Sequence, residues 1–152
     1  VATLTNELRD VDDERLEVAL HVTGLCCVNE TLATAYLERC LSLARAPVAV
    51  AANRMHLREE IDHARLGWAH LSSRAVTPDL REQLSTCVPR LLAANVPLWE
   101  REDAFLPSEG VPDHGLPSHE DACRTARAAT RDLVIPGFRH VGIEVRADAF
   151  AG

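Results

Sequence analysis

Residues 30–73 read ETLATAYLERCLSLARAPVAVAANRMHLREEIDHARLGWAHLSS and contain two helical patterns separated by Pro47. Apolar residues recur at helical spacing from about residue 13 to residue 45, and a second amphipathic pattern runs from about 48 to 73. Proline either stops a helix or occupies its first position, so Pro47 marks the junction. A link of only a few residues forces two long helices to lie antiparallel as neighbours. The stretch therefore predicts a long helical hairpin.

The segments on either side of this hairpin predict more helix. A short polar segment, Thr3–Asp10, precedes it and suggests a helical turn, and Asp12 or Asp13 can cap the first long helix. After the hairpin, Thr77 followed by Pro78 predicts the start of a third helix. Pro89 and Pro97 lie inside its apolar pattern, so we expect kinks or two shorter pieces.

The last part of the chain predicts a loop and a fourth helix. Residues 105–117 are dense in proline and glycine, which predicts a loop. Ser118, with Asp121 three residues later, predicts the cap of a helix that runs to about residue 134, where Pro136-Gly137 ends it. Together these elements predict an all-α fold in a single domain, residues 1–152.

The composition excludes several classes of protein. The chain has 152 residues, of which 47% are hydrophobic and only 4% aromatic, which suits a folded helical domain with a Leu, Val and Ala core. The net charge of −7 with no basic cluster argues against a nucleic-acid partner. The five cysteines form no Cys-x-x-Cys pair, which argues against a zinc finger or a disulfide framework. We find no signal peptide and no membrane-spanning run, so we expect a cytoplasmic protein.

Three residues of the hairpin form a candidate metal site. Glu60 and His63 are spaced i, i+3, so both side chains leave the same face of the second helix. Glu30 lies in a stretch poor in charge, where a carboxylate must be paired, hydrogen-bonded or bound to a metal. Glu30 lies about 17 residues before Pro47, and Glu60 and His63 about 13 and 16 after it, so all three are expected at nearly the same height. The alternative is a solvated charged face, because a Glu-x-x-His pair arises readily by chance in so acidic a chain.

Neighbouring residues are candidates for additional ligands or for positioning the ligands. His56 and His70 lie seven residues before and after His63, so the three histidines form a stripe along the second helix. His56 lies about one turn before Glu60 and is the better of the two candidates, although an interhelical polar contact explains either histidine equally. The remaining candidates are Glu59, Asp62 and Cys27, for which solvent exposure or, for the cysteine, core packing is the alternative.

The residues Cys27-Val28-Asn29-Glu30-Thr31, followed by Glu59-Glu60-Ile61-Asp62-His63-Ala64-Arg65-Leu66-Gly67-Trp68, resemble bacterial ferritin-like proteins. Members of that di-iron carboxylate family carry Cys-x-x-Glu-Thr on one helix and Asp-Glu-x-x-His-Ala-x-Leu-x-Trp on the next. The resemblance covers residues 20–72 and implies a ferritin-like helical bundle with Glu30, Glu60 and His63 as iron ligands. Glu59 stands where the family has Asp.

The resemblance is incomplete, because a full family member has a second set, another Glu and another Glu-x-x-His, and no second Glu-x-x-His exists in this chain. The expected site is therefore a half-site. It can be completed by a second copy in a homodimer, by a different subunit or a missing N-terminal half, or it can be degenerate and bind one metal or none.

The functional hypotheses follow from that half-site. The leading one is a non-haem di-iron oxidoreductase that activates O₂ toward a small-molecule substrate or oxidises Fe(II), with two irons per site and manganese as a second candidate metal. The alternatives are a non-catalytic helical interaction protein and a degenerate subunit of a heteromeric oxygenase.

Overall fold

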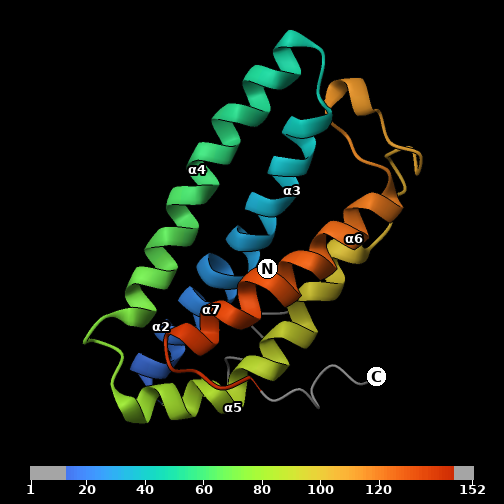
Figure 1. Cartoon of the computed structure of the whole chain (residues 1–152). Coiled ribbons are helices and arrows are strands. Elements are labelled where there is room, and N and C mark those ends of the chain that lie inside the picture. The colour runs from blue at the N-terminus through green and yellow to red at the C-terminus, as the bar shows by residue number, and fades with distance from the viewer. Residues whose placement is uncertain (1–12, 146–152) are drawn as a thin grey trace.

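The computed structural model describes residues 13–145, in which all regular secondary structure is helical, with no strand. Two long helical rods, the helix α4 and the bent helix α5 make up the structure (Figure 1). The extended pairing found in the described residues is an isolated bridge between Val111 and Leu116. The all-α prediction is confirmed. The expected segment Thr3–Asp10 lies outside the described residues.

The N-terminal rod is one continuous helix made of α2 (Glu14–Val22), a π-helical segment η1 (Thr23–Asn29) and α3 (Glu30–Leu43). The Asp13 carboxylate accepts a hydrogen bond from the Arg15 N–H at 2.9 Å, as expected of the cap. Contrary to the sequence-based expectation, this rod is long and apolar enough, by length and composition alone, to cross a membrane. Its buried residues pack against the other helices, and a core helix of a bundle has the same composition.

Helix α4 (Pro47–Ser72) folds back along this rod, which confirms the predicted hairpin. Pro47 occupies the first turn of α4, where its missing N–H costs nothing. The two helices approach each other closely at Gly67, where an added Cβ would lie 2.5 Å from the Cβ of Cys26. Glycine is therefore required at this crossing, beside the candidate metal ligands.

The third predicted helix continues without a break through Pro89, which has no N–H to donate to the helix. Helix α5 (Pro78–Asn95) is capped by the Thr77 hydroxyl, as predicted, and the helix changes to a 3₁₀ segment, η2 (Val96–Glu100), at Pro97. Figure 1 shows α5 crossing below the hairpin and then turning upward toward α6. Pro97 therefore ends the α-helix, whereas Pro89 lies inside it.

The C-terminal rod consists of α6 (His119–Ala129), a second π-helical segment η4 (Thr130–Val134) and α7 (Ile135–His140). The prediction that Pro136-Gly137 ends this helix was wrong. In the wide π turn the Ile135 N–H donates to the Thr130 carbonyl, five residues earlier. This change of hydrogen-bond register comes directly before Pro136, which has no N–H to donate. Gly137 is needed because a Cβ there would lie 2.7 Å from the ring of Trp68.

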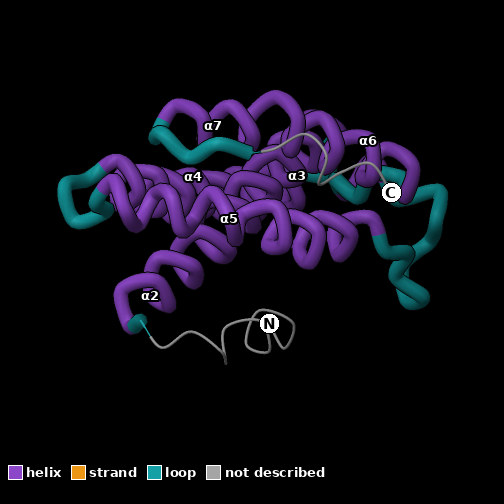
Figure 2. Tube along the Cα trace, turned by 90° about the horizontal axis from the view of Figure 1, so that it is seen from below, coloured by secondary structure: helices purple, strands orange, loops and turns teal. Residues whose placement is uncertain are grey.

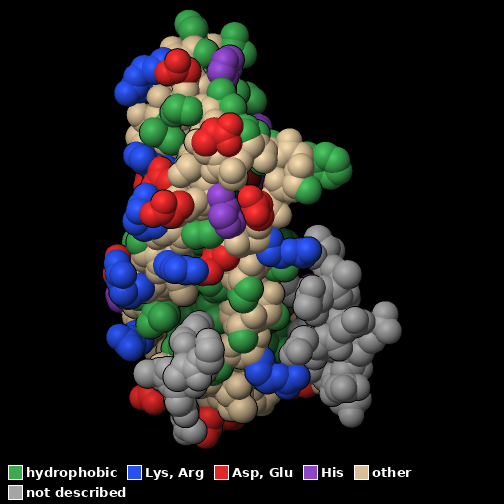
Figure 3. All heavy atoms as spheres, turned by 90° about the vertical axis from the view of Figure 1, so that its right-hand side faces the viewer, with side chains coloured by type: hydrophobic (Ala, Val, Ile, Leu, Met, Phe, Trp, Pro, Cys, Tyr) green, Lys and Arg blue, Asp and Glu red, His purple; other side chains and the backbone are tan. Residues whose placement is uncertain are grey.

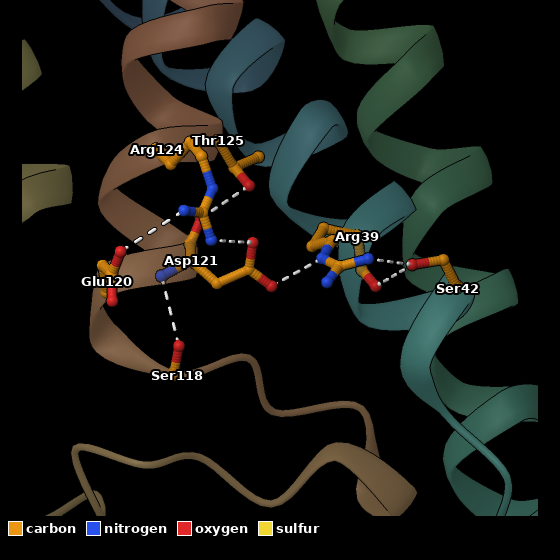
Figure 4. Close-up of polar contacts among 7 residues, drawn as sticks. All are labelled: Arg39, Ser42, Ser118, Glu120, Asp121, Arg124 and Thr125. Carbon is orange, nitrogen blue, oxygen red and sulfur yellow. Dashed lines mark hydrogen bonds and ion pairs between the residues drawn. The ribbon is translucent and has the colours of Figure 1, made fainter.

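The C-terminal rod lies against one side of the hairpin (Figure 2) and is attached to it by an ion pair. Arg39 of α3 donates to the Asp121 carboxylate at 2.6 Å, and Arg124 donates to the other oxygen at 3.2 Å (Figure 4). Burial alone would raise the pKa of Asp121, but the hydrogen bonds from Arg39 and Arg124 outweigh it and the pKa is lowered. Ser118 caps α6 as predicted.

The predicted loop before α6 contains a single 3₁₀ turn, η3 (Pro112–His114). The Asp113 carbonyl of this loop accepts hydrogen bonds from the N–H groups of Arg45 and Ala46, which fixes the turn of the hairpin. On the face shown in Figure 3, acidic and basic side chains are interspersed.

Candidate metal centre

The three predicted ligands meet between the N-terminal rod and α4. Glu30 is the first residue of α3, directly after the π-helical segment, and Glu60 and His63 lie near the middle of α4. One ligand atom from each residue lies within 4.8 Å of the other two. His63 Nδ1 lies 3.1 Å from Glu60 Oε2. The predicted convergence of Glu30, Glu60 and His63 at one level therefore occurs within a single chain.

The charges of the three groups are strongly linked. Burial, together with a hydrogen bond to Glu60, raises the pKa of Glu30 to about 7. The same hydrogen bond and the neighbouring His63 lower the pKa of Glu60, and Glu60 raises that of His63. Glu30 therefore keeps its proton to a higher pH than an isolated carboxyl group does, as expected of two like charges at short range.

The cluster lies at the surface. The side chain of Glu60 is 26% exposed and that of His63 is 56% exposed. No element within residues 13–145 covers them from the outside. The charge-poor stretch around Glu30 suggests a shielded carboxylate, but the cluster is open on one side in the single chain.

A network of side-chain hydrogen bonds next to the cluster fixes the position of Glu30, and this network was not predicted from the sequence. The Asn29 amide donates to the carbonyl of Gly24, inside the π turn, and to the side chain of Asn95 on α5. Trp99 donates to the Asn29 side-chain oxygen at 3.0 Å. On α3, the Thr34 hydroxyl donates to the Glu30 carbonyl at 2.8 Å. The signal in the sequence was Asn29 beside the expected ligand Glu30, together with the polar side chains of Asn95 and Trp99 in the third helical segment.

The other predicted residues occupy different positions. His56 is exposed, yet close enough for its charge to help lower the pKa of Glu60. Glu59 and Asp62 are exposed on α4, where Asp62 pairs with Arg65 at 3.4 Å. His70 is half-buried and lines a hollow with Val18 and His21.

The adjacent cysteines Cys26 and Cys27 lie in different surroundings. Cys27 is fully buried in the core, in agreement with the packing alternative, so its thiol does not join the cluster. Cys26 is half-buried between Gly67 and Glu30, and the charge of Glu30 contributes to its raised pKa, after burial. Cys26 is therefore the cysteine that lies next to the candidate site.

A second set of ligands is absent from residues 13–145, where no other group of three acidic, His or Cys side chains converges. Two acids of the later helices are held by arginines. Glu100 receives two hydrogen bonds from Arg127, and Asp121 is held by Arg39 and Arg124. Within the described residues, Glu30, Glu60 and His63 are therefore the group that converges.

Comparison with models of known protein families, with curated proteins and with solved structures finds no match. The interpretation of the site therefore rests on its own geometry and chemistry.

The donor set suits a hard or borderline divalent cation. Two carboxylates and one imidazole are ligands that iron and manganese both accept. A cation placed among them would replace the proton held between Glu30 and Glu60 and would remove their mutual repulsion. The residues present thus fit one half of a carboxylate-bridged metal pair.

Proposed function

We propose that this chain is a ferritin-like, non-haem di-iron protein whose metal centre is built from Glu30, Glu60 and His63. The observation that carries the proposal is the convergence of these three side chains from two helices to within 4.8 Å. Manganese is the alternative metal, because its ligand preferences are similar.

When bound, a pair of irons would supply one-electron chemistry toward O₂, in an oxidoreductase acting on a small molecule or in the oxidation of Fe(II). The chain's own residues prepare for this role. Glu60 is oriented by His63, and Glu30 is held in place by the Asn29 network and by the close packing at Gly67. The open side of the cluster leaves access for ligands from a second chain, either another copy or a different subunit.

A non-catalytic helical interaction protein is the second candidate, and one observation favours it. In the absence of a metal, Glu30, Glu60 and His63 already satisfy each other by hydrogen bonds. The same cluster could then act as a polar contact in a protein–protein interface or in a degenerate subunit of a heteromeric oxygenase.

Metal stoichiometry, measured together with the mass in solution, distinguishes these functions. The protein is stripped of metal, titrated anaerobically with Fe(II) or Mn(II), and then exposed to air to look for a near-ultraviolet charge-transfer band. We expect one metal per chain and loss of binding in Glu60→Gln, because that change removes a charged ligand. The matched control is Glu59→Gln, the adjacent exposed acid, which should bind as the wild type does. Equal uptake by Glu60→Gln and the wild type, or no uptake by either, would rule out the metal assignment.

A further inference from the structure

A solvent-exposed stripe on α4 runs beside the half-site; it is apolar toward its two ends and acidic in the middle. Val48, Met55 and Leu66 are large hydrophobic residues that are 81%, 56% and 68% exposed. With the exposed Ala52, Glu59 and Asp62 they recur at alternating spacings of four and three residues, the repeat with which one helix packs against another in a coiled coil. We call residues 48, 52, 55, 59, 62 and 66 the α4 stripe.

The α4 stripe lies on a different side of the helix from the contact with the N-terminal rod. That contact is made by the buried residues Ala64, Gly67 and Leu71. At about 100° per residue, the stripe is displaced from this contact by about 140° around the helix axis. His63 falls between the two directions, and Glu60 falls on the side of the contact with the N-terminal rod. This is the arrangement of a helix that has two neighbours in a bundle and directs its metal ligands toward the space between them.

The N-terminal rod carries a matching exposed surface. Val18 and Leu25 are 56% and 53% exposed, and Val18 lies in the same four-residue row as Cys26 and Glu30. Since α4 is about 39 Å long at 1.5 Å per residue, a hairpin face about 20 Å wide offers roughly 800 Å². That is the area each partner contributes to a stable protein–protein interface.

We propose that this face binds a second copy of the same chain in a two-fold dimer, with the two hairpins enclosing one complete metal centre. The inference rests on the proposed function for the role of the dimer and names the partner that completes the site. Two copies supply four carboxylates and two imidazoles, the donor set of a carboxylate-bridged metal pair. A second copy is sufficient because each chain holds one Glu and one Glu-x-x-His.

The positions in the α4 stripe are consistent with this symmetry. Met55 lies five residues before Glu60 and Leu66 lies six after it. An antiparallel pairing of α4 with its symmetry mate about this level places Met55 of one copy opposite Leu66 of the other, and brings both Glu60 residues to the same height. In this pairing Glu59 of one copy lies at the level of Asp62 of the other, and Arg65, which pairs with Asp62 at 3.4 Å, supplies a positive charge at that level.

The test measures mass in solution on metal-free protein, so that its result does not depend on metal binding. Multi-angle light scattering of the full chain, over a range of concentrations in the presence of a chelator, should give twice the 16.7 kDa mass of one chain. Leu66→Glu should shift the dissociation constant upward by at least tenfold, and Met55→Lys should do the same. The two together should restore the dimer, because the new charges would face each other only across the interface.

Two controls separate this result from a general effect of surface charge. Leu133→Glu alters a residue that is 50% exposed in a groove on the other side of α4, and it should leave the mass unchanged. Circular dichroism should show the same helicity for every variant.

A wild-type protein that is monomeric at all concentrations, with and without added Fe(II), would overturn the inference. So would a dimer that Leu66→Glu leaves intact, because a different face, or a different occupant of this one, would then be responsible. If the protein is a dimer and the variants change its mass as expected, but it binds no metal, only the proposed function would be contradicted.

Discussion

Replacing Gly67 by alanine should destabilise the protein, although the same change in an exposed helix is stabilising. An added Cβ would lie 2.5 Å from the Cβ of Cys26 and 3.0 Å from both the Cys26 carbonyl carbon and the Cys27 sulfur. Carbon atoms pack at about 3.5–4.0 Å, so α4 must move away from the N-terminal rod by about 1 Å. Two of the three nearest atoms are the Cβ and the carbonyl carbon of Cys26, which no side-chain rotation can move away.

The two energy terms have opposite signs. Overpacking a well-packed contact costs about 1–3 kcal/mol, and the higher helix propensity of alanine returns about 1 kcal/mol. We expect Gly67→Ala to lose a net 1–2 kcal/mol, roughly, because the contact is with backbone. For a chain of this size that corresponds to a fall in Tm of about 3–6 °C. Metal affinity should fall about tenfold or more, because Glu30 and Glu60 separate with the helices.

Urea unfolding followed by circular dichroism measures the free energy of unfolding, and titration with Fe(II) or Mn(II) measures the metal affinity. Ala51→Gly, an exposed position in the same helix, is the matched control. It should lose about 1 kcal/mol from propensity alone and leave metal binding unchanged. If Gly67→Ala were more stable than the wild type by the propensity gain, with unchanged metal affinity, the close approach at this crossing would not be what positions the ligands.

Three further changes test the electrostatics and the polar contacts. Metal-free Glu30→Gln should be more stable than the wild type above pH 7 in urea unfolding. Because the pKa of Glu30 is raised to about 7, the protonated side chain stabilises the fold fully below its ordinary pKa. That contribution to the free energy of unfolding is lost as the pH rises through 7, and Gln, which cannot ionise, does not lose it. Asp121→Asn should be destabilised at pH 6–8 through loss of the Arg39 contact. That deficit should close in acid-titrated thermal melts as the pH falls through the lowered pKa of Asp121. Asn29→Ala should cost about 1–3 kcal/mol in thermal unfolding, because the Gly24 carbonyl and the Trp99 N–H lose their partner.

The hairpin could be predicted because its signals are local. Proline at position 47, the cap at Asp13 and the apolar spacing each act within a few residues of the element they define. The meeting of Glu30 with Glu60 could also be predicted, since the heights of residues in two antiparallel helices follow from counting outward from the turn. What counting does not reveal is how open the site is, because exposure depends on which sides of the hairpin the remaining helices cover.

The C-terminal rod shows why other features could not be predicted. Proline followed by glycine at 136–137 is a strong local stop signal, yet the helix continues to His140. The continuation depends on a π turn and on the packing of Phe138 and Gly137 against Trp68, which are tertiary contacts. Local signals therefore predict where helices begin more reliably than where a buried helix ends.

The π turn of the N-terminal rod links the core to the candidate metal centre. Its buried residues come in pairs that recur every fourth residue: Ala19 and Leu20, Thr23 and Gly24, Cys27 and Val28, Thr31 and Leu32. An α-helix would rotate such a row by about 40° per step, whereas the wider π turns keep it in line. Thr23 supports the first wide turn by donating its hydroxyl to the Ala19 carbonyl, and Thr130 makes the equivalent bond to Ala126 in the other rod. Glu30 follows directly on this segment, so its approach to Glu60 depends on the same distortion that keeps the core aligned.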